Sequence, residues 1–146
     1  MSHVLDQGAI EKLQQEIDRN VVALWTLGED HLEFASGLHA RFWRQRVSRL
    51  YYSALNMKRG VTLNHSGDFS TDVSDHKNIG NLPPDFPSAS TFGTKLMNLR
   101  DDRNLADYSH LASESDLVLT PTDAQALVVD FQTATRNYLK SRGVTL

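Results

Sequence analysis

The stretch that decides the fold is residues 40–63, "ARFWRQRVSRLYYSALNMKRGVTL". Its apolar residues recur every three or four positions, which places them within a single arc of a helical wheel. They are Trp43, Val47, Leu50, Tyr51, Ala54 and Val61. Such an arc predicts a helix that buries one face. We therefore expect residues 40–63 to form the longest helix of the protein, with this arc in the core.

Helical spacing continues on both sides of this stretch. It predicts a first helix over residues 8–27, an interruption at "LGED" (27–30), and a further helical segment that begins at Asp30 as N-cap. After the central stretch it returns over residues 92–105. A last helix is expected to open at "TPTD" (120–123), with Thr120 as N-cap and Pro121 at the first helical position, and to end near Gly143.

Residues 64–91 interrupt this pattern. They hold three of the four prolines and many Ser, Asp and Asn residues, which predicts a long loop. Loops of this length in compact domains are usually functional or disordered. No segment alternates as a β-strand does, so the sequence predicts an all-α fold. We expect residues 1–146 to form one domain, an antiparallel bundle of four or five helices.

Composition narrows the classes of function. The chain has 40% hydrophobic and 23% charged residues, as an ordinary globular protein does. It has no cysteine, which excludes thiolate nucleophiles and Cys-ligated zinc. A net charge of −3 argues against a generally basic nucleic-acid-binding surface, so any RNA contact must be local. No apolar run reaches the roughly 20 residues that span a bilayer, and "MSHVLDQGAI" lacks a signal-peptide pattern, so a cytoplasmic location is expected.

No cofactor or metal site is expected from the sequence. The chain contains no Gly-rich phosphate loop, and the His and Asp residues of the predicted loop match no zinc or calcium spacing. Their side chains are more simply interpreted as solvated.

One short motif carries possible chemistry, the stretch "RNLADYSH" at residues 103–110. An Arg followed a few residues later by a His is a weak signal, since chance alone gives about one such pair in this composition. Requiring Asn, Asp or His directly after the Arg lowers the chance expectation to about 0.2. The pair formed by Arg59 and His65 fails this test, because Gly60 follows the arginine, whereas Arg103 with Asn104 passes.

Three pieces of sequence together resemble one known family. They are "RLYYSALNMKRGVTL" (49–63), "SDHKNI" (74–79) and "LRDDRNLADYSH" (99–110). In this order they look like the HEPN family (higher eukaryotes and prokaryotes nucleotide-binding domains), with similarity over about residues 40–110. The resemblance implies a small helical bundle that commonly dimerises, and metal-independent ribonuclease activity through Arg103, Asn104 and His110. The family also includes members without nuclease activity.

Helix geometry indicates why such a motif would need two chains. On a helix that continued through residue 110, Arg103 and His110 would differ by about 20° in direction but lie about 10 Å apart along the axis. A twofold mate would bring two arginines and two histidines into one cleft, so we expect a homodimer. In it His110 would transfer a proton, Arg103 would stabilise charge on phosphate, and Asn104 would orient the substrate or the imidazole.

Basic and aromatic residues also share the polar face of the central helix. The candidates for holding single-stranded RNA there are Arg41, Arg49, Tyr52 and Arg59. The same face could equally be solvated or form a subunit contact.

Two hypotheses of different class follow from the sequence. The first is a homodimeric endoribonuclease that acts as a toxin or defence effector. The second is a catalytically silent HEPN module that binds a partner such as a nucleotidyltransferase. In the second, Arg103 would form an ion pair within its own chain, with Asp102 or Asp107 as partner.

Overall fold

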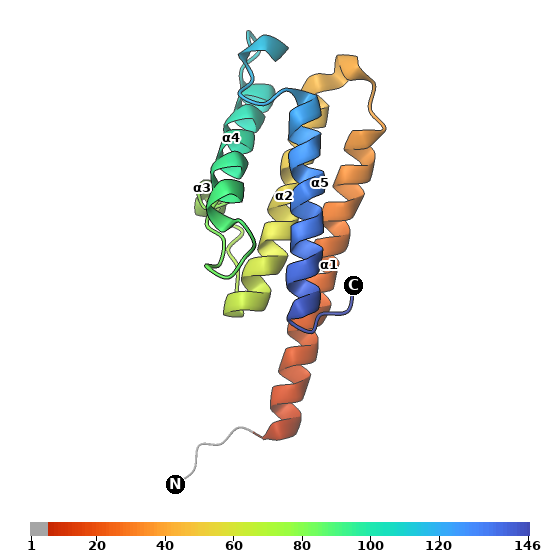
Figure 1. Ribbon diagram of the computed structural model, residues 1–146, viewed down its shortest axis with the longest axis vertical. Helices are drawn as coiled ribbons and strands as arrows, with labels where there is room; N and C mark the ends of the chain where they lie inside the picture. Colours follow the sequence, from red (N-terminus) through yellow and green to blue (C-terminus); the bar gives the residue numbers. More distant parts are fainter. Residues whose placement is uncertain (1–5) are drawn as a thin grey trace.

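The computed structural model describes residues 6–146, which form an antiparallel bundle of four long helices. The chain runs up, down, up and down through them (Figure 1). The long helices are α1 (Gln7–Ser36), α2 (Trp43–Ser66), α4 (Ala89–Tyr108) and α5 (Pro121–Ser141). Three short elements complete the fold: η1 (Ala40–Phe42), α3 (Val73–Lys77) and η2 (Glu114–Asp116). Residues 6–146 contain no β-strand, so the prediction of an all-α bundle is confirmed.

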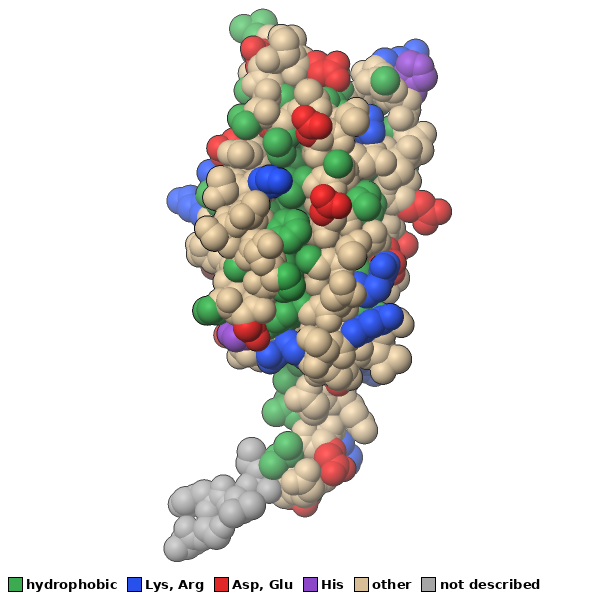
Figure 2. Space-filling view, viewed as in Figure 1, with side chains coloured by type: hydrophobic (Ala, Val, Ile, Leu, Met, Phe, Trp, Pro, Cys, Tyr) green, Lys and Arg blue, Asp and Glu red, His purple; other side chains and the backbone are tan. Residues whose placement is uncertain are grey.

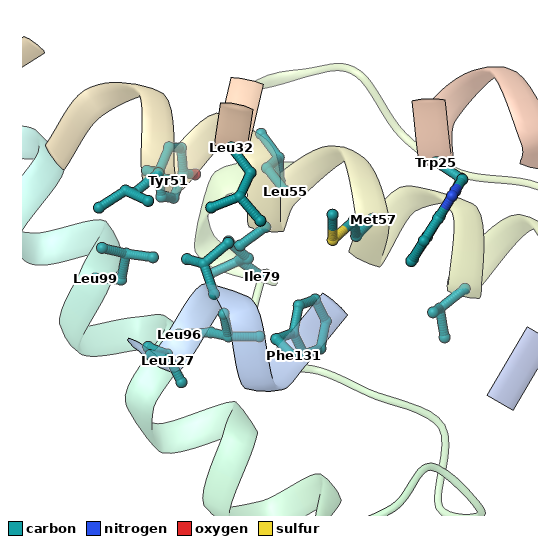
Figure 3. Close-up of a cluster of buried hydrophobic side chains, with 14 of the residues drawn as sticks. Trp25, Leu32, Tyr51, Leu55, Met57, Ile79, Leu96, Leu99, Leu127 and Phe131 are labelled. Carbon is teal, nitrogen blue, oxygen red and sulfur yellow. The ribbon is translucent and has the colours of Figure 1, made fainter. Parts of the chain in front are cut away.

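Helix α2 is the centre of this bundle, since it packs against α1, α4 and α5. Figure 3 shows its side chains Tyr51, Leu55 and Met57 pointing into a core that α1, α4 and α5 also enter. All three are completely buried. Burial of a large apolar side chain contributes about 1.5–3 kcal/mol, so α2 supplies much of the stability through side chains both inside and outside the arc found in the sequence.

The predicted interruption at "LGED" is wrong, because α1 continues through it as one helix of 30 residues. Gly28 lies where α1 packs closely against α2. A β-carbon at this position would lie 2.8 Å from Cγ of Met57 and 2.9 Å from the carbonyl oxygen of Ser53. The hydroxyl of Ser53 also donates to the Gly28 carbonyl over 2.6 Å. The glycine therefore marks a helix crossing, Asp30 caps nothing, and α1, not α2, is the longest helix.

Signals at the start and end of the last helix are confirmed. The Thr120 side chain accepts a hydrogen bond from the backbone N–H of Asp123, Pro121 is the first residue of α5, and Gly143 follows the helix with φ of +88°. The predicted loop over residues 64–91 is shorter in the structure, where α2 and α4 are separated by residues 67–88 and α3 lies between them.

The surface is mixed, and one end of α1 stands apart from the rest. In the view of Figure 2, acidic, basic and apolar side chains are interspersed, with apolar groups gathered along the seam between α4 and α5. The first turns of α1 project beyond the bundle (Figure 1), and they leave Ile10 and Leu13 exposed. Within residues 6–146, no helix combines the length and the apolar character needed to cross a membrane.

The helix crossing at Gly28 yields a test of the fold. Gly→Ala inside a helix ordinarily stabilises it by up to about 1 kcal/mol. At Gly28 we expect the opposite, a loss of about 1–3 kcal/mol in the free energy of unfolding, because the methyl group would overlap α2. Gly37→Ala is the control, since a β-carbon there meets nothing closer than 3.7 Å. Urea denaturation of both variants measures the difference, and equal stability of the two would contradict the packing described.

Candidate functional site

The candidate site forms where three helices meet around the side chain of Arg103. Arg103 comes from α4 and is only 5% exposed. Its guanidinium carbon lies 4.6 Å from the ring centroid of Tyr51, on α2. Its Nη2 lies 3.3 Å from Nδ1 of His76, on α3, and the Tyr51 hydroxyl lies 2.6 Å from the same nitrogen. Arg103, Tyr51 and His76 thus form one contiguous cluster.

Short-range and long-range contacts hold α3, and with it His76, in this place. The Asp72 side chain caps α3 by accepting from the backbone N–H of Ser74 over 2.9 Å. Asp75 is buried and accepts from Nε of Arg59, on α2, over 2.7 Å. A buried ion pair of this kind is weak evidence for net stability but fixes geometry, since removing one partner strands the other.

Beyond α3, two glycines bring the chain directly onto α4. A β-carbon on Gly80 would lie 2.6 Å from the carbonyl oxygen of Gly93, and one on Gly93 would lie 2.5 Å from that of Gly80. No side chain fits between the two backbones. Residues on both sides of His76 are therefore anchored, one side to α2 and the other to α4.

The donors around His76 determine its protonation. A guanidinium can only donate hydrogen bonds, so Nδ1 of His76 has to be an acceptor, and the Tyr51 hydroxyl can donate to it as well. The neutral ring then carries its hydrogen on Nε2. Burial lowers the pKa of His76, and the positive charges of Arg103 and Arg59 lower it further, against the opposing effect of Asp75. Burial also raises the pKa of Tyr51 to about 12, so this hydroxyl keeps its proton. His76 therefore offers an N–H donor to a ligand rather than a base.

Beside this cluster lies a cavity of about 480 Å³, here called the arginine cavity. Its lining residues are Tyr52, Val73, His76, Lys77, Arg100, Arg103, Asn104 and Tyr108. Three of these residues are cationic, and no Asp or Glu of the described chain is among them. Carboxylates do stand nearby, with Asp101 at 2.9 Å from Arg100 and Asp107 at 3.9 Å from Arg103. An anion is the ligand that such a lining favours.

The structure brings together two of the three residues predicted to be catalytic. Arg103 and Asn104 both line the arginine cavity, whereas His110 does not. Helix α4 ends at Tyr108, and His110 lies exposed in the turn that follows. The assumption that the helix continues through residue 110 is therefore wrong, and the two side chains do not share a helix face. The homodimer stays a prediction, since the structure holds one chain.

Arg44 explains why the chain leaves the helix at this point. Its Nη1 donates to the carbonyl oxygens of Ala106 and Ser109 over 2.9 and 2.8 Å, and its Nη2 donates to that of Ala112 over 2.6 Å. A cation that satisfies the terminal carbonyls of a helix stabilises its end. Arg44, at the start of α2, thus holds the turn that carries His110.

Of the two carboxylates expected to pair with Arg103, Asp102 is engaged elsewhere, whereas Asp107 forms a long ion pair with it. Asp102 is buried and accepts from the backbone N–H groups of Val118 and Leu119 over 2.7 and 2.9 Å. Burial raises the pKa of this carboxyl, although those two hydrogen bonds oppose the rise. Asp107 accepts from the hydroxyl of Ser48 over 3.3 Å and lies at the outer limit of an ion pair with Arg103. Arg103 thus has a carboxylate at 3.9 Å and the Tyr51 ring beside it, all within its own chain.

The four residues predicted to hold RNA are divided by the structure. Tyr52 lines the arginine cavity, and together with Arg49 it lines a second cavity of about 530 Å³ between α2 and α4. Arg59 is instead committed to Asp75. Arg41 stacks on its neighbour Phe42, at 4.6 Å from the ring centroid, and lines neither cavity.

Sequence reasoning missed several members of the site: Tyr51, His76, Lys77, Arg100 and Tyr108. Tyr51 is indeed buried in the core, as predicted, but its hydroxyl reaches the site. His76 was interpreted as solvated because it stands in a Pro-, Ser- and Asp-rich segment. The signal that could have found it is its place in "SDHKNI", one of the three pieces that carry the resemblance. Among residues 6–146, no group of three or more His, Cys, Asp or Glu side chains is placed to hold a metal ion.

Comparison with known proteins adds no relative to this description. No family model matches the chain, and neither the curated proteins nor the solved structures give a match.

The hydrogen-bond arrangement at His76 leads to a spectroscopic test. We expect the His76 ring to carry its hydrogen on Nε2 and to titrate below the ordinary value of 6.5, because burial and Arg103 disfavour the imidazolium. Arg103→Met should raise the His76 pKa. The unfolded chain binds the proton more readily, so this residue reduces stability as the pH falls through about 6.5. Nitrogen-15 NMR of the histidine rings measures both properties, and a hydrogen on Nδ1 would contradict the arrangement.

Proposed function

We propose that this protein is a HEPN-type endoribonuclease that binds single-stranded RNA through the arginine cavity and cleaves it, as a homodimer, without a metal ion. The observation that carries the proposal is the placement of Arg103. It is buried, oriented by Tyr51 and His76, and opens together with Asn104 into a cavity whose lining is cationic. The three pieces of sequence that resemble the family support the same function.

A phosphate group suits this cavity for electrostatic reasons. A guanidinium is a planar fork of donors that matches phosphate oxygens, and its attraction for an anion is larger where water is excluded. Removing a charge from water is costly unless an opposite charge compensates. The nearest carboxylate oxygen to Arg103 is 3.9 Å away, so it compensates only part of the free-energy cost of burying the guanidinium. A bound phosphate would compensate the rest.

The tyrosines beside the cavity favour single-stranded nucleic acid over free phosphate. Tyr108 is 73% exposed and Tyr52 is half-buried between the two cavities, so both offer ring surface next to the cations. Stacking of a base on an aromatic ring contributes about 1–3 kcal/mol and needs an unpaired base. Arg49 in the second cavity extends the basic path along α2, as expected for a strand that crosses both cavities.

Cleavage needs a proton acceptor that the cavity of one chain lacks, since Nδ1 of His76 is occupied. His110 is exposed on the turn held by Arg44, and a twofold mate could bring it to the Arg103 of the other chain. There His110 would take the proton from a ribose 2′-hydroxyl as that oxygen attacks phosphorus. The 5′-oxygen would leave and take a proton from water, giving a 2′,3′-cyclic phosphate and a 5′-hydroxyl. Arg103 and Asn104 would stabilise the charge on the phosphate oxygens. A toxin or defence effector is the role we propose for such an enzyme.

One observation favours the alternative, a catalytically silent module. Arg103 is held by contacts within its own chain, and His110 of that chain lies outside the cavity. In that case the cavity would bind an anionic group of a partner such as a nucleotidyltransferase.

Substitution of the proposed catalytic residues tests cleavage directly. His110→Ala should lower the rate on labelled single-stranded RNA in EDTA by roughly 10²- to 10⁴-fold, the usual contribution of general acid–base catalysis. Arg103→Ala should have a similar effect through lost stabilisation of the transition state, on the order of 2–4 kcal/mol. His65→Ala is the control, because His65 lines neither the arginine cavity nor the second cavity. If the wild-type protein cleaves RNA no faster than His110→Ala, with EDTA and with Mg²⁺, the nuclease proposal fails and the binding module takes its place.

Assembly is tested separately from chemistry. We expect a homodimer at concentrations on the order of tens of micromolar by light scattering, with an interface that includes Arg103 and His110. Mixing His110→Ala with Arg103→Ala should restore part of the activity, because a mixed dimer holds one site with both wild-type residues. A strictly monomeric protein would contradict both the dimer and the nuclease.

A further inference from the structure

The arginine cavity holds more positive charge than one internal RNA phosphate requires. Arg100, Arg103 and Lys77 all line it, and His76 adds an uncharged N–H donor. An internal phosphodiester carries a single negative charge. A terminal phosphate carries about −1.5 to −2 at pH 7 and presents three strong acceptor oxygens.

The carboxylates near the cavity leave part of this charge free. Arg100 is paired with Asp101 over 2.9 Å, and Arg103 is 3.9 Å from Asp107. Across residues 6–146, no ion pair engages Lys77, and Lys77 is exposed at the cavity. Arg103 is deeply buried and Lys77 exposed, so the cations lie at different depths of one cavity. This arrangement suits one compact group of high charge at the end of a chain.

We infer that the arginine cavity preferentially binds a phosphomonoester dianion, the terminal phosphate of an RNA strand, over an internal phosphodiester. This inference rests on the proposed RNA-binding function and adds the substrate class. Tyr52 and Tyr108 would then stack on the terminal base or its neighbour.

The same charge arrangement fits the proposed chemistry. When a 2′-oxygen attacks an internal phosphodiester, the phosphoryl oxygens gain negative charge in the transition state, and an enzyme site is complementary to that state rather than to the ground state. A phosphomonoester dianion carries a similar negative charge on its phosphoryl oxygens in the ground state. RNA with a terminal phosphate should therefore occupy the cavity and compete with RNA that is to be cleaved.

The pH dependence of this preference originates in the ligand. The second ionisation of a phosphomonoester has a pKa near 6. The titratable and charged groups that face His76 are Tyr51, Tyr52 and Arg59 from α2, Asp75 from α3 and Arg103 from α4. Burial and the two arginines lower the His76 pKa against the effect of Asp75. The imidazolium form of His76 is therefore disfavoured, and the second charge of the phosphate is the main change, so the preference should grow as the pH rises through about 6.

Fluorescence anisotropy with matched oligonucleotides tests the inference. One short single-stranded RNA is prepared with a 5′-phosphate and a label at the 3′ end, and with a 3′-phosphate and a label at the 5′ end. The unphosphorylated strand is prepared with each of the two labels. His110→Ala serves as the binding protein, so that cleavage does not remove the ligand. We expect one phosphorylated form to bind at least about tenfold more tightly than the unphosphorylated strand at about pH 7.5, as one further charge-assisted hydrogen bond would produce. The gain should shrink toward pH 5.

Variants connect that gain to the cavity. Lys77→Ala and Arg100→Ala, each in the His110→Ala background, should remove most of the gain while the unphosphorylated strand still binds. Lys95→Ala is the matched control, since Lys95 is an exposed cation of the same helix as Arg100 and lines none of the cavities described above. Loss of the gain in the Lys95 variant alone would overturn the assignment.

Two outcomes separate this inference from the function on which it rests. If strands with and without a terminal phosphate bind equally, and Arg103→Ala weakens both, RNA binding stands and the terminal-phosphate preference is overturned. If no form of the RNA binds, the proposed function fails first. Displacement of the labelled strand by a free 5′-mononucleotide at the same concentration as the phosphorylated strand would overturn the assignment to an RNA end.

Discussion

The hydroxyl of Tyr51 has to find a hydrogen-bond partner, because its ring lies completely in the core and a buried hydroxyl without a partner is costly. Nδ1 of His76 meets this need at 2.6 Å. The contact requires α3 to lie against α2 and leaves the face of the Tyr51 ring for Arg103. This hydrogen bond joins α2 to α3 at the point where Arg103 lies over the Tyr51 ring and reaches His76, so the three side chains constrain one another.

Signals within one turn of a helix could be predicted well from the sequence. The Thr120 cap is local and appears in the structure as expected. Five of the six residues of the α2 arc are buried as well, but Trp43 is only half-buried, and residues 53–58 are buried on every side because α2 packs against α1, α4 and α5. Gly28 was misjudged because its role depends on Ser53 and Met57 of another helix, which spacing along the chain does not reveal. The same cause explains the end of α4, since Arg44 is more than 60 residues distant in sequence from the carbonyls that it binds.

The candidate site likewise combines residues that a local motif indicates with a residue that only long-range contacts bring in. Arg103 and Asn104 are adjacent in the chain, and the motif that singled them out placed both at one cavity. His76 joins them from a segment whose composition is typical of a solvated loop, and only the close approach of Gly80 to Gly93 and the pair formed by Arg59 and Asp75 make it part of the site. Local sequence thus identified the arginine of the candidate site, whereas tertiary contacts select the histidine beside it.

Tertiary packing stabilises helix α1 unevenly along its length. Its buried residues begin at Val21 and recur to Ala35, while residues 7–16 are exposed and the first turns project past the bundle. Isolated helical turns are marginal in water, so those outer turns depend mostly on their own hydrogen bonds and the Asp6 cap. Amide protons there should exchange through local fraying, whereas those near Trp25 should wait for the opening of the core. One continuous helix therefore contains two regions of different cooperativity. The part within the bundle unfolds only with the core, whereas the first turns can fray and re-form while the site is undisturbed.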